Sequence, residues 1–220
     1  MSSLVSPESR TLTVSEETAN MLTHGFGLVL SVVGTVVLVQ TAQARGNLLQ
    51  TVGCWIYGCT LVSLYAASTL SHSFENPKLR HFFRMLDQVC IFLLIAGNFP
   101  PFALSYFLEG WLWALCISMW GGAIVGIFFK VFFSRLKNVA VSAYVMLGWI
   151  PVMAIKPMTA RLPAMALFWI LAGGLMYMLG TLFLTNDGKV RYFHAVWHLF
   201  VIAGSICHYV AVINFTLPWP

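Results

Sequence analysis

The sequence predicts an all-α fold, a bundle of seven transmembrane helices that makes the chain a polytopic membrane protein. Hydrophobic residues make up 59% of the 220 residues and charged residues only 9%, whereas ordinary soluble domains carry about 25% charged residues. The apolar residues gather in seven runs, and a helix of roughly 20 apolar residues crosses a bilayer core with its backbone groups satisfied internally. The remaining polar surface is too small to coat a soluble globule.

The runs predict helices, in order, at residues 20–40, 48–73, 85–108, 111–129, 139–155, 162–184 and 192–217. Turn-forming or charged sequences separate them: Arg45-Gly46-Asn47, Glu75-Asn76-Pro77-Lys78, Glu109-Gly110, the segment 134–138, Lys156-Pro157 and Asn186-Asp187-Gly188-Lys189. Residues 1–17 are expected to form a polar cytoplasmic segment, which lacks the pattern of a secretory signal and is expected to be retained. Residues 18–220 are expected to form one transmembrane domain.

The positions of lysine and arginine predict the orientation, because short positively charged loops stay in the cytoplasm. A cytoplasmic N-terminus puts nine of the 12 basic residues inside, namely Arg10, Lys78, Arg80, Arg84, Lys130, Arg135, Lys137, Lys189 and Arg191. Only Arg45, Lys156 and Arg161 then lie outside. We therefore expect the C-terminus outside, and we attribute the net charge of +5 to topology rather than to a nucleic-acid partner.

Ionisable side chains inside membrane helices are costly and therefore mark functional sites. His194 and His198 lie four residues apart at the start of the last helix, a spacing at which two imidazoles can chelate one metal ion. Ser68 and His72 have the same spacing at the end of the second helix, so they share one helical face. Asp87 stands just inside the third helix, where on its own it is expected to pair with Arg84 or Arg80.

The first helix begins with a polar stripe in which Glu17, Asn20 and His24 share a face. An acidic residue in a first turn also complements the helix dipole, and Thr13 with Glu16 would form a capping box just before it. Both explanations remain open for Glu17. The three residues are accessory candidates for a site at this end of the bundle.

The expected topology places all these polar groups at one depth, in the cytoplasmic half of the bundle. Three neutral imidazoles leave a fourth tetrahedral position of Zn²⁺ open, as in catalytic zinc sites. Imidazole also suits copper, iron and nickel, so zinc is favoured without the others being excluded. His208 lies about 15 Å further along the last helix and is expected to be a hydrogen-bonded core histidine, while His81 is expected to be solvated.

These motifs together resemble the three signatures of the progestin and adipoQ receptor superfamily, whose bacterial branch is the hemolysin-III-like proteins. The resemblance spans Glu17 to Val210, and Ala67-Ser68-Thr69-Leu70 and His194-Ala195-Val196-Trp197-His198 look like the bacterial branch. In two places the sequence departs from that pattern. Gln88 follows Asp87 where many relatives carry histidine, and Asn98-Phe99-Pro100-Pro101 replaces a more usual Thr-Tyr-Thr-Pro, so substrate contacts of the third helix are expected to differ.

The resemblance implies that His72, His194 and His198 hold zinc, with Asp87 and Ser68 as catalytic residues near the metal-bound water. Adiponectin receptors and alkaline ceramidases suggest a zinc-dependent intramembrane hydrolase of lipid amides or esters, active in membrane homeostasis. The expected partners are membrane lipids, such as a lipid amide or a fatty acid, and the expected location is the bacterial cytoplasmic membrane.

Two alternatives to hydrolysis remain. The first is a non-catalytic, zinc-stabilised membrane regulator or receptor. The second, ranked last, is a pore-forming hemolysin. A pore needs a polar stripe through the whole membrane, whereas the outer halves of these helices are almost uniformly apolar.

Overall fold

The structure is a computed structural model that describes residues 13–107, 112–132 and 137–218. Within these ranges every regular element is helical, and seven helical spans are long and apolar enough to cross a membrane. The predicted fold class and the number of spans are confirmed. Most of the predicted polar segment 1–17 and the predicted break at Glu109-Gly110 lie outside the described residues.

The first two helices begin at side-chain caps. The Thr13 hydroxyl accepts a hydrogen bond from the Glu16 backbone N–H, and the Glu16 carboxylate accepts one from the Thr13 backbone N–H. This confirms the predicted capping box and starts α1 (Val14–Arg45) earlier than the predicted residue 20, so that Glu17 lies inside the helix. Asn47 caps α2 (Leu48–Ser73) in the same way, after the chain breaks at Arg45-Gly46-Asn47 as predicted.

The third span begins earlier than the predicted residue 85. The Asn76 side chain accepts hydrogen bonds from the backbone N–H groups of Lys78 and Leu79, and Pro77 occupies the first helical position, where its missing N–H costs nothing. The span consists of α3 (Pro77–Gly97) and the short α4 (Pro100–Tyr106). The two helices are separated just before two consecutive prolines, which disfavour a continuous helix.

The remaining elements are α5 (Leu112–Phe132), α6 (Lys137–Trp149), the 3₁₀ helix η1 (Ile150–Ala154), α7 (Ile155–Arg161), α8 (Ala164–Leu184) and α9 (Phe193–Phe215). The predicted break at Lys156-Pro157 is wrong. Pro157 lies in the first turn of α7, where no intrahelical N–H bond is required. The helix ends at Arg161, and Leu162 caps it just before Pro163.

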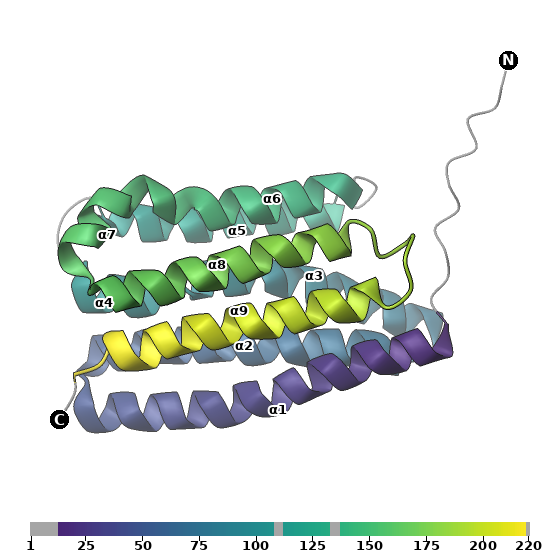
Figure 1. The fold of residues 1–220 in the computed structure, drawn as a ribbon, viewed down its shortest axis with the longest axis horizontal. Coiled ribbons are helices and arrows are strands. Elements are labelled where there is room, and N and C mark those ends of the chain that lie inside the picture. The colour runs from purple at the N-terminus through teal and green to yellow at the C-terminus, as the bar shows by residue number, and fades with distance from the viewer. Residues whose placement is uncertain (1–12, 108–111, 133–136, 219–220) are drawn as a thin grey trace, which may run out of the picture.

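The helices run side by side along the long axis of the molecule (Figure 1). α1 packs on α2 and α9, α2 on α3 and α4, α3 on α5 and α6, and α8 on α9. The start of α1 and the end of α9 lie at opposite ends of the bundle (Figure 1). The end where α1, α3 and α9 begin and α2 stops is called the N-terminal end below.

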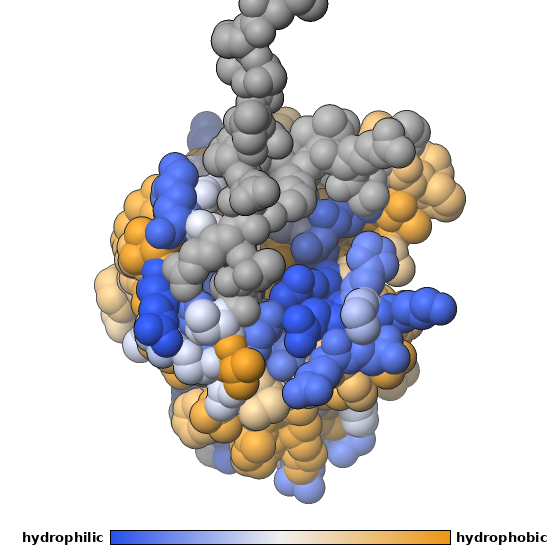
Figure 2. Space-filling view, turned by 90° about the vertical axis from the view of Figure 1, so that its right-hand side faces the viewer, coloured by the Kyte–Doolittle hydropathy of each residue, from blue (hydrophilic) through white to orange (hydrophobic). Residues whose placement is uncertain are grey.

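The flanks of the bundle are apolar and exposed. Large side chains such as Phe26 and Val29 on α1 and Leu171 and Leu175 on α8 are more than half exposed, which a water-soluble surface of this extent would not tolerate. Figure 2 views the N-terminal end, where hydrophilic residues gather and hydrophobic residues show beside and below them. The outward-facing surface therefore suits lipid, and polar groups concentrate where the bundle ends.

Candidate metal centre

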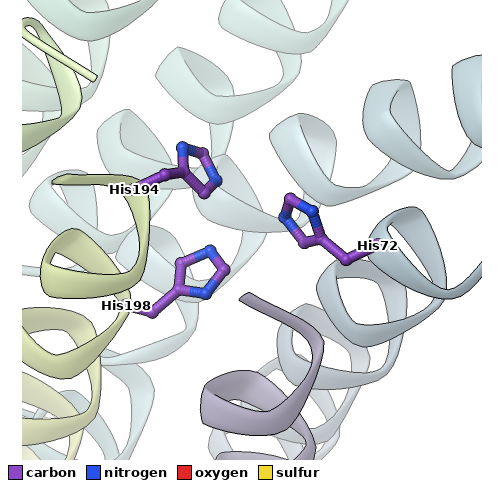
Figure 3. Close-up of side chains that lie close together, drawn as sticks. All are labelled: His72, His194 and His198. Carbon is purple, nitrogen blue, oxygen red and sulfur yellow. The ribbon is translucent and has the colours of Figure 1, made fainter. Parts of the chain in front are cut away.

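Three histidines from two helices meet near the N-terminal end of the bundle. His72 lies in the last turn of α2, and His194 and His198 lie in the first two turns of α9. Their rings point into one space between the helices (Figure 3), and one ring nitrogen from each lies within 4.8 Å of the other two. His72 and His198 are buried, and His194 is half-buried. His194 and His198, four residues apart on α9, therefore lie on one face of the helix and point toward His72, as predicted.

Glu17 on α1 fixes the orientation of His72. Nδ1 of the imidazole donates a hydrogen bond to Oε2 of the Glu17 carboxylate at 2.6 Å. The other carboxylate oxygen accepts a hydrogen bond from Arg84 at 2.9 Å and lies 3.9 Å from Arg80. Nε2 of His72 is buried and has no hydrogen-bond partner among the described residues, so its lone pair remains for another ligand.

Asp187 fixes the orientation of His194, as Glu17 does for His72. It lies in the turn between α8 and α9, and its Oδ2 accepts a hydrogen bond from Nδ1 of His194 at 2.8 Å. The turn returns through Tyr192, which adopts a left-handed backbone conformation, and the Tyr192 N–H donates to Glu16 on α1. Asp187 was not predicted as a site residue, although the sequence placed it in a turn seven residues before His194.

His198 is oriented by α1. Its Nδ1 lies 3.2 Å from the backbone carbonyl oxygen of Asn20 and 3.0 Å from the Thr23 hydroxyl. Because a carbonyl oxygen only accepts, Nδ1 of His198 carries the proton. All three clustered histidines thus use Nδ1 to donate to an oxygen, which leaves Nε2 unprotonated in the tautomer that binds metals.

A second set of polar groups lies directly beside the cluster. The Ser68 hydroxyl is 2.6 Å from Nδ1 of His24. The Asp87 carboxyl is hydrogen-bonded to Ser68 and interacts electrostatically with His194. The His24 ring stacks on the His198 ring with centroids 3.5 Å apart. The salt bridges of Arg84 and Arg80 go to Glu17, so the expected pairing of Asp87 with these arginines gives way to contact with the cluster.

The stripe on α1 contacts the cluster through all three of its residues. Glu17 binds His72, Asn20 offers its backbone carbonyl to His198, and His24 contacts both Ser68 and His198. All three are buried, so Glu17 does much more than complement the helix dipole. The structure therefore brings together every residue that the sequence nominated for the site.

The residues fit a transition metal ion with nitrogen ligands. Three neutral imidazoles match the protein ligands of catalytic zinc sites, and the buried, unpartnered Nε2 of His72 is a polar atom that a metal ion would satisfy. A hydrogen bond from the second ring nitrogen to a carboxylate or a backbone carbonyl is the usual support of a metal-binding histidine. Imidazole ligands alone do not separate zinc from copper, iron or nickel.

An apolar cavity of about 530 Å³ lies in the bundle, further from the N-terminal end than the cluster. Its lining includes Leu64, Ile91 and Val201, which lie three or four residues from Ser68, Asp87 and His198 respectively. One turn of helix rises about 5.4 Å, so the cavity begins about one turn from the cluster. It extends to Asn98, Phe102 and His208 near the other end.

The remaining two histidines lie outside the cluster. His81 is exposed at the start of α3, as predicted. The prediction for His208 is wrong, because both of its ring nitrogens are buried without a hydrogen-bond partner in the described part of the chain. Its ring packs against Gly173 and Tyr177 of α8, which provide space and an aromatic face but no acceptor for the ring.

The sequence matches known proteins along almost its whole length. A family model described as Haemolysin-III related matches residues 12–209, a range that contains every residue of the site. The chain is 38% identical over 206 residues to Hemolysin-3 of Bacillus cereus, covering 93% of this chain and 94% of that protein. It is 35% identical over 210 residues to a Hemolysin-3 homolog of Bacillus subtilis, covering 94% and 98%. It is 30% identical over 211 residues to the human monocyte to macrophage differentiation factor, covering 91% and 84%.

Proposed function

The chain belongs to the haemolysin-III related family, the branch that its motifs predicted, and we propose that it is a zinc-dependent intramembrane hydrolase of lipid amides or esters. The observation that carries the proposal is the convergence of His72, His194 and His198 beside Asp87 and Ser68. A metal ion that only holds helices together needs nothing but its ligands. An unused carboxylate and a hydroxyl beside an incomplete ligand set are the groups that hydrolysis needs.

A zinc ion held by His72, His194 and His198 would acidify a water molecule and polarise a carbonyl group. In this reaction Asp87 would take a proton from the water as its oxygen bonds to the acyl carbon, and would pass that proton to the leaving nitrogen or oxygen as the acyl bond breaks. The Ser68 hydroxyl lies between Asp87 and His24 and can orient either the carboxyl or the substrate carbonyl. His24, stacked on His198, fixes the position of that hydroxyl.

The apolar cavity supports a lipid as the substrate. It begins about one helical turn from the cluster and is lined mainly by aliphatic and aromatic side chains, so an acyl chain lying in it would place its carbonyl group next to the histidines. The excess of basic residues at the N-terminal end supports a cytoplasmic location for that end. The reaction would then take place in the inner half of the bacterial cytoplasmic membrane.

The first experiment measures metal in the purified protein by elemental analysis. We expect about one zinc per chain, lost in His72→Ala, His194→Ala and His198→Ala and kept in the control His81→Ala, which replaces an exposed histidine. A panel of lipid amides and esters is then tested for hydrolysis. Asp87→Ala should keep some zinc and lose turnover, whereas a metal-free wild-type protein would overturn the proposal.

A non-catalytic regulator is the second candidate, and the origin of the ligands favours it. His72 comes from α2 and the other two histidines from α9, so a bound metal would join two helices far apart in the sequence. Zinc that binds as described, with no turnover of any amide or ester in the panel, would select this function. Pore formation ranks last, since the exposed flanks and the cavity lining are largely apolar.

A further inference from the structure

Two arginines of α3 converge on one carboxylate oxygen at the edge of the histidine cluster. Nη2 of Arg84 donates a hydrogen bond to Oε1 of Glu17 at 2.9 Å, and Nη1 of Arg80 lies 3.9 Å from the same oxygen. The other carboxylate oxygen accepts the hydrogen bond from Nδ1 of His72. One negative charge therefore lies between two positive charges, which leaves a surplus positive charge beside the cluster.

The two guanidinium groups keep most of their hydrogen-bonding capacity. A guanidinium group has five N–H donors. Within the described part of the chain, Arg84 donates one hydrogen bond, to Glu17, and Arg80 donates one, from Nε to the backbone carbonyl oxygen of Phe74. The side chains of Arg84 and Arg80 are 44% and 32% exposed, so a part of each is open to a ligand that approaches this end of the bundle.

Membrane topology alone does not explain this arrangement. Basic residues at a cytoplasmic end orient a membrane protein wherever their side chains point, and the exposed Lys78 on the same helix supplies such a charge. Like charges four residues apart on a helix repel each other, yet Arg80 and Arg84 both turn toward Glu17. The planar fork of arginine matches the oxygens of carboxylates and phosphates, so a second anion between these side chains would offset the repulsion.

The helix that carries the arginines also carries the catalytic candidate and part of the cavity. Arg84, Asp87 and Ile91 follow one another at intervals of three or four residues and therefore share one face of α3. Arg84 lies about 4.5 Å from Asp87 along the helix axis, and Ile91, which lines the cavity, lies about 6 Å from Asp87 in the opposite direction. Arg84 interacts electrostatically with both Asp87 and His72. The order along the bundle is thus guanidinium groups, cluster and apolar cavity.

This order matches the parts of an acidic lipid. A lipid with its acyl chain in the cavity and its carbonyl group at the cluster would place the other side of its amide or ester bond next to Arg84 and Arg80. We infer that these two arginines bind an anionic group, a phosphate or a carboxylate, on the part of the lipid that leaves on hydrolysis. The inference rests on the proposed function for the placement of the lipid, and it narrows the substrate class to amides and esters with an acidic leaving part.

The test compares three probes that share one palmitoyl chain: N-palmitoylglycine carries a carboxylate, the phosphate ester of N-palmitoylethanolamine carries a phosphate, and N-palmitoylethanolamine is neutral. Binding to the purified full-length protein in a nonionic detergent is measured by competition with a neutral fluorescent acyl amide, with and without a metal chelator. We expect at least one acidic probe to bind about tenfold tighter than the neutral one, the size of effect that a charge-assisted hydrogen bond gives. The tighter of the two acidic probes identifies the anion.

Two variants assign the preference to the arginines. Arg84→Gln should abolish the preference for the acidic probe and leave binding of the neutral probe unchanged, and Arg80→Gln should reduce the preference several-fold. Lys78→Gln is the matched control, because it removes one positive charge from an exposed position at the start of the same helix, and it should keep the preference. If Arg84→Gln no longer binds the neutral probe, the lost contact with Glu17 has disturbed the fold, and Arg80→Gln, which breaks no hydrogen bond to Glu17, decides.

The outcomes separate this inference from the proposed function. Equal binding of the three probes by the wild-type protein overturns the anion site, and so does a preference that Lys78→Gln loses as fully as Arg84→Gln, because the attraction would then come from the general surface charge. A preference that survives both arginine variants also overturns it, and its loss on adding the chelator would show that the anion binds the metal ion. A preference that depends on Arg84 in a protein that hydrolyses no lipid retains the anion site and refutes the hydrolase. Hydrolysis of the neutral probe without any binding preference does the reverse.

Discussion

Glu17 and His72 are joined by a hydrogen bond of 2.6 Å between the carboxylate Oε2 and the imidazole Nδ1, with only 11% and 3% of the two side chains exposed. This contact ties the first turn of α1 to the last turn of α2. It gives His72 the tautomer and the ring orientation that metal binding requires. A carboxylate at the start of a transmembrane helix thus acts at the site through a histidine, without being a ligand itself.

Replacing Glu17 should weaken metal binding without removing a ligand. Losing an outer hydrogen-bond partner typically lowers metal affinity about 10- to 100-fold, so we expect a loss of this size for Glu17→Ala and a smaller one for Glu17→Gln, whose amide oxygen still accepts from Nδ1. Competition with a chromophoric chelator measures the affinity. Glu75→Gln, which changes an exposed carboxylate before α3, serves as the control, and unchanged affinity in Glu17→Ala would refute this role.

Asp187→Ala should have a similar but weaker effect through His194. The pair is more exposed than Glu17 with His72, since 33% of the Asp187 side chain and 20% of the His194 side chain are exposed. Water can therefore replace the lost carboxylate, and we expect a loss of metal affinity below about tenfold, at the low end of the usual range. The same chelator titration ranks the variants, and a larger loss for Asp187→Ala than for Glu17→Ala would contradict the argument from exposure.

Replacing glycine by alanine should have opposite effects on stability at two positions of α5. A Cβ on Gly126 would lie 2.3 Å from Cε1 of Phe92, which is buried against Tyr144, whereas a Cβ on Gly121 meets no atom within 4 Å. Overpacking a filled core costs about 1–3 kcal/mol, and alanine in place of glycine favours a helix by up to about 1 kcal/mol. Thermal unfolding in detergent should show Gly126→Ala less stable than the wild type and Gly121→Ala at least as stable.

The helices and the depth of the site follow from local sequence features. Apolar length predicted seven spans, and helical spacing put Glu17, Asn20 and His24 on one face and His194 and His198 on another. These relations depend only on the chain within one helix, and the alternation of spans with short breaks supplied the relative direction of the helices. The charge pattern adds only the cytoplasmic side of the bundle, which stays a prediction. The start of α3 was missed even though Asn76-Pro77 is a typical helix start.

The lateral contacts of the helices could not be predicted in the same way. Arg84 was expected to bind Asp87 on its own helix, yet its guanidinium reaches Glu17 on α1, because the packing of α1 and α3 around α2 decides which carboxylate is nearer. Asp187 reaches His194 through the path of a turn, which spacing along the chain does not give. The unpartnered state of His208 depends on its neighbours on α8, and these are again set by packing.

Metal binding should stabilise the folded bundle, because the three ligands come from α2 and α9 and are brought together only by folding. A ligand that binds only the folded state adds about 2.7 kcal/mol when its concentration is 100 times its Kd. We therefore expect zinc to raise the thermal unfolding temperature of the wild-type protein in detergent and a chelator to lower it. His81→Ala should respond in the same way.

His198→Ala isolates the cluster as the cause of this stabilisation. It removes one ligand from α9 together with its contacts to α1, so the variant should already be less stable than the chelated wild type and should not respond to zinc or chelator. Asp87→Ala provides the opposite case, because it keeps all three imidazoles and should still respond. If zinc instead shifted the unfolding of His198→Ala as much as that of the wild type, the stabilising ion would bind elsewhere, and the cluster would not be the metal centre.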